Sequence, residues 1–82
     1  MPYEIPYIGE ALRDARTRRA MSQHELAKRA GVTQPAVSLA ERGADMRVST
    51  LQQVAAALDL VPVLVPRRAV PMVRNVIASM PE

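Results

Sequence analysis

The alternation of apolar and polar residues divides the chain into four stretches. From residue 8 to residue 60, apolar residues recur every three or four positions, which predicts a run of amphipathic helices. Residues 1–7 hold two prolines and both tyrosines and indicate an extended N-terminal arm. Residues 61–68 begin with valines that alternate with proline and leucine, and residues 69–82 form a tail. The pattern predicts an all-α domain of four to five helices, followed by one short β-strand.

Capping signals mark the ends of the first two helices. Apolar spacing predicts a first helix over roughly residues 7–20. Ser22 and Glu25 match the S-x-x-E capping box, in which each side chain accepts a hydrogen bond from the backbone N–H of the other residue. Gly31 tolerates the left-handed conformation that commonly ends a helix. A second helix is therefore expected between Ser22 and Gly31.

Two further helices are predicted by the same kinds of signal. Thr33 can cap a third helix, with Pro35 in its first turn, where the missing N–H costs no hydrogen bond. Gly43 is expected to close this helix. Ser49 and Gln52 match a second capping box, which predicts the start of a fourth helix. The buried face of that helix is expected to carry Leu51, Val54, Ala55 and Leu58.

The second and third helices have the features of a steeply crossed pair. Ala27 is small enough to lie where the two helices cross, and Gly31 supplies the positive φ that the short turn between them needs. Inward-facing positions hold the apolar residues Leu26, Val32, Val37 and Ala40. These are the requirements of a helix-turn-helix.

The spacing along this segment matches a known family. Counted from Gln23, the fifth residue is small, the ninth is glycine, and the fifteenth and eighteenth are apolar. With the flanking helices included, residues 8–60 resemble the lambda Cro and repressor type of helix-turn-helix, also called the XRE family. The resemblance implies a lambda-repressor-like fold that binds operator DNA and represses transcription. The alternative is an ordinary helical bundle in which the same spacing occurs by chance.

The resemblance also implies roles at a DNA surface. Gln23 matches a glutamine that contacts a DNA phosphate, and the third helix is expected to lie in the major groove. There the amide of Gln34 can pair with adenine, the alternative being a solvated side chain. Pro35, Ala36 and Leu39 offer only apolar contacts, for instance with thymine methyl groups, which leaves room for recognition of DNA shape. The candidate DNA-binding residues are Gln23, Lys28, Thr33, Gln34, Pro35, Ala36, Ser38, Leu39, Arg42 and Arg47.

An ion pair is implied as well. In this family an arginine of the first helix often pairs with a glutamate at the end of the recognition helix, and Arg16 and Glu41 match those positions. We expect a partly buried pair that fixes the first helix on the motif. Its net contribution to stability is expected to be small, because desolvation of the two charges opposes their attraction.

A short apolar segment follows the helices. The two prolines within residues 61–66 restrict it to an edge strand. Because a helical domain offers such a strand no partner, we expect it to pair with the same strand of a second copy in a twofold homodimer. The pairing residues would be Val61, Val63, Leu64 and Val65. Such a dimer implies a pseudo-palindromic operator. The alternative is an apolar arm folded over the chain's own helices.

A helix-turn-helix followed by one such strand is similar to HipB-type antitoxins. This resemblance implies a HipA-like kinase toxin as partner and repression of the antitoxin's own operon. The tail is expected to form a short amphipathic helix that docks on the dimer or on a partner, or else to fray. Its apolar face would carry Met72, Val73, Val76, Ile77 and Met80. The alternatives are a stand-alone XRE regulator, such as a phage repressor or a restriction-modification controller, and a protein-interaction module without DNA binding.

Composition narrows the candidate functions. Eleven Lys and Arg against eight Asp and Glu give a net charge of +3, which favours an anionic partner such as nucleic acid. Two Tyr, with no Phe or Trp, disfavour stacking on single-stranded nucleic acid. Without Cys and with His24 as the one histidine, we expect no metal site, no catalytic triad and no cofactor. The lack of a long apolar run or a secretion signal predicts a cytoplasmic protein at the nucleoid.

Overall fold

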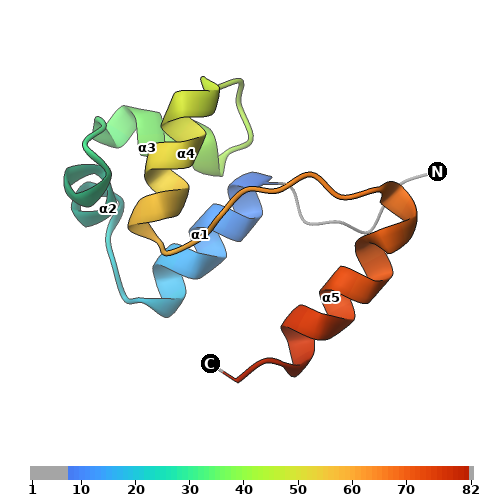
Figure 1. Cartoon of the computed structure of the whole chain (residues 1–82). Coiled ribbons are helices and arrows are strands. Elements are labelled where there is room, and N and C mark those ends of the chain that lie inside the picture. The colour runs from blue at the N-terminus through green and yellow to red at the C-terminus, as the bar shows by residue number, and fades with distance from the viewer. Residues whose placement is uncertain (1–7, 82) are drawn as a thin grey trace.

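The computed structural model describes residues 8–81, and the expected arm, residues 1–7, lies outside this range. The helices are α1 (Ile8–Arg18), α2 (Gln23–Ala30), α3 (Gln34–Glu41), α4 (Val48–Ala57) and α5 (Val70–Ser79), with a short 3₁₀-helix, η1 (Arg67–Ala69), directly before α5. Figure 1 shows α1–α4 gathered in one bundle and α5 set apart at the end of an extended segment. The expected all-α fold is confirmed.

An apolar core lies between the first four helices, which we call the four-helix bundle. Within it, α2 packs against both α3 and α4, and α1 packs against α3. The largest fully buried side chains are Leu26, Val37, Val54 and Leu58, all four at positions that the spacing predicts to face inward. Burying one side chain of this size contributes about 1.5–3 kcal/mol, so these four supply much of the bundle's stability.

The turn between α2 and α3 follows the predicted local signals. The backbone N–H of Glu25 donates to Ser22 Oγ over 3.0 Å, and the backbone N–H of Ser22 donates to Glu25 Oε1 over 2.9 Å. Gly31 ends α2 in the left-handed conformation, with a φ of 72°. Thr33 Oγ1 then caps α3 by accepting a hydrogen bond from the backbone N–H of Ala36 over 3.2 Å. These caps satisfy backbone donors at the starts of both helices of the motif.

The start of α4 differs from the prediction. The capping box expected at Ser49 is wrong, because α4 begins at Val48 and Arg47 is its N-cap residue, without a side-chain hydrogen bond. The backbone N–H of Leu51 donates to the carbonyl of Arg47 over 3.1 Å. Met46 and Leu51 are both partly buried against the core and occupy the two positions of a hydrophobic staple. Burial of these two side chains, rather than a polar cap, sets where α4 begins.

Beyond α4 the chain is extended from residue 60 to residue 66, and no strand forms within residues 8–81. The described residues offer this segment no neighbouring strand, and pairing across a dimer stays a prediction. In Figure 1 the segment runs from the end of α4 past α1 toward η1. The tail forms a helix, α5, which buries none of its residues.

Candidate nucleic-acid interface

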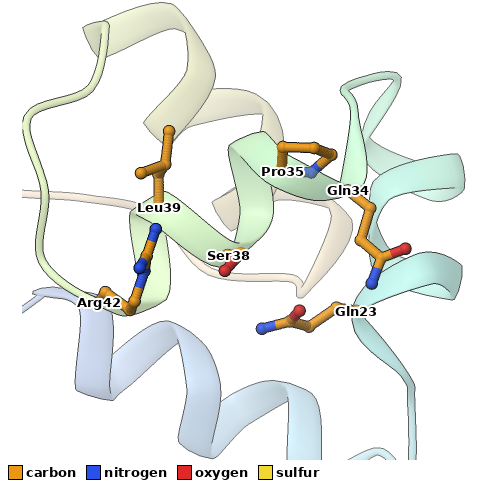
Figure 2. A pocket seen from close by; sticks show the side chains of 6 residues that line it. All are labelled: Gln23, Gln34, Pro35, Ser38, Leu39 and Arg42. Atoms are coloured by element: carbon orange, nitrogen blue, oxygen red, sulfur yellow. The ribbon is translucent and has the colours of Figure 1, made fainter.

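A shallow groove runs along the exposed side of α3. It is lined by side chains from the start of α2, from α3 and from the residue after α3, namely Gln23, Gln34, Pro35, Ser38, Leu39 and Arg42 (Figure 2). All six are among the ten residues expected from the sequence to contact DNA. The groove therefore combines amide, hydroxyl and guanidinium groups with apolar carbons. Base edges in a major groove offer partners for all of these, as hydrogen-bond donors, acceptors and thymine methyl groups.

The other four candidate residues lie outside this groove. Thr33 is exposed, but its hydroxyl serves as the cap of α3, and Ala36 is partly buried. Lys28 lies in the last turn of α2 and Arg47 at the N-cap of α4, and both are exposed. Cations at the rim of a reading helix suit phosphate groups rather than base edges.

A buried ion pair lies behind the groove. Arg16 Nε donates to Glu41 Oε2 over 2.6 Å, and Arg16 Nη2 donates to Glu41 Oε1 over 3.0 Å. The side chains of Arg16 and Glu41 are only 13% and 3% exposed. Arg16 Nη1 also donates to the carbonyl oxygen of Met21 over 2.8 Å. This pair, which the family resemblance implies, ties α1 and the turn after it to the end of α3.

The ionisation of this pair follows from its contacts. Burial acts to raise the pKa of Glu41, but hydrogen bonds from Arg16 and Gln23 outweigh burial, and the pKa of Glu41 lies below its ordinary value. The hydrogen bond to Glu41 in turn raises the pKa of Arg16. Both groups are therefore charged at neutral pH.

Gln23 connects the ion pair to the groove. Its Nε2 donates to Glu41 Oε1 over 3.1 Å. An ionised carboxylate can only accept hydrogen bonds, so it fixes which end of the amide faces Glu41. The amide oxygen and the second N–H of Gln23 then remain for a ligand in the groove. This link between Gln23 and Glu41 was not expected from the sequence, because no local pattern connects residues 18 positions apart.

Gly9 is a structural residue that sequence reasoning missed. A Cβ atom at this position would lie 2.6 Å from the carbonyl oxygens of both Ala40 and Glu41. The backbone of α1 therefore approaches the end of α3 more closely than any other residue would allow. A glycine inside a helical pattern was the available signal, since glycine there commonly marks close approach of another backbone.

The part of the chain that the structure describes was found to hold neither a metal-binding cluster nor a membrane-spanning helix. Residues 8–81 contain no group of three or more His, Cys, Asp or Glu side chains placed to hold a metal ion. None of the helices within residues 8–81 has the length and apolar character needed to cross a membrane.

Comparison with known proteins agrees with this geometry. The model of the family described as helix-turn-helix matches residues 12–64. A protein from Sinorhizobium fredii (strain NBRC 101917 / NGR234), y4dL, named as an uncharacterized HTH-type transcriptional regulator, is 42% identical over 80 residues. The match covers 96% of this chain and 41% of the relative, so the chain spans less than half of that protein's length. The chain belongs to the helix-turn-helix family.

Proposed function

We propose that this chain binds double-stranded operator DNA through α3 and represses transcription. The observation that carries the proposal is the groove along α3, whose residue Gln23 is held in place by the buried Arg16–Glu41 pair. Membership of the helix-turn-helix family supports the same placement of α3. A surface that reads DNA must hold its polar groups in fixed positions, and this network does so for one of them.

In this mechanism α3 enters the major groove with its N-terminal turn leading. Gln34, in that turn, offers its amide to the N6 and N7 atoms of an adenine. Ser38 lies one helical turn further along the same face. Pro35 and Leu39 meet thymine methyl groups, and Gln23 contacts a phosphate at the N-terminus of α2, where backbone N–H groups also favour an anion.

The test is binding to DNA upstream of the chain's own gene, measured by fluorescence anisotropy. We expect Gln34→Ala to weaken binding by about 10- to 100-fold, since a bidentate base contact is worth about 1–3 kcal/mol. Gln23→Ala should weaken binding to all sequences alike. Gln53→Ala is the matched control, because Gln53 is an exposed glutamine on α4 away from the groove. Unchanged affinity in both groove variants would contradict the proposal, and absence of any DNA binding would favour a protein-interaction module.

The proposed active form is a homodimer paired through residues 61–65. Along an extended segment, alternate residues direct their N–H and C=O groups to the same edge. Pro62 and Pro66 lie on the same edge as Leu64, and that edge lacks two N–H donors because proline has none. The opposite edge, formed by Val61, Val63 and Val65, keeps all of its backbone N–H donors. An antiparallel ribbon centred on Val63 uses that edge and places the twofold axis at Val63.

A cysteine test locates this axis, since the chain has no cysteine of its own. In the ribbon, two Val63→Cys residues face each other with Cα atoms about 5.5 Å apart, which suits a disulfide. Two Leu64→Cys residues are diagonal neighbours and further apart, although Leu64 is fully exposed in the single chain. We expect rapid oxidation of the Val63→Cys dimer and slow oxidation of the Leu64→Cys protein. Equal rates would contradict the ribbon.

The finer proposal is a HipB-like antitoxin that represses its own operon and neutralises a HipA-like kinase toxin. It is supported by the order of elements along the chain, in which a helix-turn-helix is followed by one extended segment. The prolines of that segment leave one edge free to pair as a β-strand. Co-expression of the tagged chain with the products of neighbouring genes tests it. A kinase recovered in stoichiometric amount supports the antitoxin role. Tight operator binding with no such partner would leave a stand-alone regulator, such as a phage repressor or a restriction-modification controller.

A further inference from the structure

The C-terminal region, residues 60–80, leaves its apolar side chains uncovered. Nine of the twelve large apolar residues that are exposed within residues 8–81 lie in this region. On α5 they are Met72, Val76 and Ile77, and Met80 follows directly after the helix, each of the four more than 60% exposed. A helix of ten residues is marginal in water by itself, and its stability must come from packing of its apolar face. That face therefore needs a cover.

An apolar groove on the four-helix bundle is also unfilled. It lies between α1, α4 and the extended segment, and its lining includes Ile8, Ala11, Leu51, Ala55, Val61 and Leu64. Gln52 stands among these residues as a polar group at the surface. The groove is on a different part of the bundle from the α3 surface, because the two share no lining residue. Occupation of this groove would leave the α3 surface open.

The two uncovered surfaces complement one another in a twofold dimer. One is an apolar helix face and the other an apolar groove, and each copy of the chain carries both. Packing of the helix of each copy into the groove of the other forms the contact twice. A standard stable interface removes about 800 Å² from each partner, and a contact made twice helps to reach that size.

We propose that α5 of each protomer packs into the α1–α4 groove of the other protomer. The proposal rests on the strand pairing inferred above. In an antiparallel ribbon centred on Val63, residue 65 of one copy lies opposite residue 61 of its partner. Residues 66–70 of one copy therefore leave the ribbon beside residues 60 and 61 of the partner, which line the partner's groove. The ribbon delivers each α5 to the other subunit, and the exchange covers both apolar surfaces at once.

The exchange is tested by cross-linking two differently tagged proteins, each with a single cysteine, after mixing. We expect Gln52→Cys on one chain and Ile77→Cys on the other to give a product that joins unlike chains under a short bismaleimide. Asn75→Cys replaces Ile77→Cys as the control, because Asn75 lies on the polar side of α5. A third protein carries both Gln52→Cys and Ile77→Cys on one chain. If it formed only a cross-link within that chain, and no product joined unlike chains, α5 would pack on the groove of its own chain and the proposal would be overturned.

A second measurement uses the intact chain without cross-linkers. Val76→Asp combined with Ile77→Asp should weaken dimerisation in analytical ultracentrifugation by about 100-fold, because each substitution occurs in both copies. Asn75→Asp adds charge to the other face of α5 and should leave the dimer intact. An unchanged dimer in the double variant would overturn the exchange even if Val63→Cys still forms its disulfide. Helical content by circular dichroism and binding to a single operator half-site report separately on whether the bundle and the DNA surface survive.

Discussion

The four-helix bundle and the C-terminal region use similar apolar residues in opposite ways. In the bundle, Leu26 and Leu58 are almost completely buried, whereas Leu64 in the C-terminal region is fully exposed. The bundle also pairs its buried charge, Glu41, with Arg16 and leaves no buried side-chain polar atom unsatisfied within the described residues. The bundle is thus complete within one chain. The C-terminal region has the composition of a packed element but leaves its apolar side chains exposed in the single chain, and its proposed partner is a second copy.

Two leucine substitutions should separate the regions most strongly. Leu26→Ala is expected to lower the free energy of unfolding by about 2–5 kcal/mol, because it leaves a cavity in the core. Leu64→Ala, measured by urea unfolding at a concentration where the chain is monomeric, should change it by less than about 0.5 kcal/mol. Comparable losses for the two variants would contradict the contrast between the regions.

The buried ion pair gives the next largest effect. Glu41→Gln keeps the shape of the side chain but leaves the Arg16 guanidinium without its charged partner, and we expect a loss of about 1.5–3 kcal/mol in urea unfolding. Because the pKa of Glu41 is lowered in the folded chain, its contribution is complete above the ordinary pKa of 4.5 and is lost as the pH falls through the folded-state pKa. The difference in stability between native chain and variant should therefore shrink in acid. A difference that stays constant down to pH 3, or grows, would be inconsistent with this ionisation.

Gly9→Ala tests the contact between α1 and α3. The added Cβ would meet two carbonyl oxygens at 2.6 Å, so the two helices must move apart, at a cost of about 1–3 kcal/mol. Asp14→Gly is a useful comparison on the same helix, because Asp14 is exposed and lines neither groove, so the change lowers only the helix propensity. Gly9→Ala should also weaken DNA binding, since it disturbs the end of α3. A variant as stable as the native chain would show that the close approach is dispensable.

Two serines in matching sequence contexts give the smallest effect. Ser22→Ala should cost about 1 kcal/mol, because Ser22 caps α2. Ser49→Ala should cost less than about 0.5 kcal/mol, because Ser49 lies inside α4 and caps nothing. Thermal unfolding compares them directly. If the Ser49 variant lost as much stability as the Ser22 variant, the apolar staple would not be what sets the start of α4.

These serines also show how far local signals predict the fold. The caps at Ser22, Thr33 and Gly31 were predictable because each depends on residues only a few positions apart. The start of α4 was not, because a capping box and a hydrophobic staple compete there and burial of Met46 decides. For the C-terminal region, the sequence predicts the helix α5 but not what covers it, since no local pattern specifies the surface on which a helix packs.

The candidate site was predictable to a similar degree. Most residues of the groove follow from one helix, α3, and from its match to the family pattern. The link from Gln23 to Glu41 and the contact at Gly9 each join separate helices, and they needed the three-dimensional arrangement to be seen.

The most direct test of the central claim, that α3 reads base pairs in operator DNA, is a double-mutant cycle between Gln34 and the operator. Each A·T pair of a half-site is replaced in turn, and affinities are measured for the native chain and for Gln34→Ala at one fixed salt concentration. The account predicts one position where the replacement weakens binding by the native chain about 10- to 100-fold but barely affects Gln34→Ala. If both proteins responded equally to every replacement, α3 would not read bases through Gln34, and the proposed placement of α3 in the major groove would be contradicted.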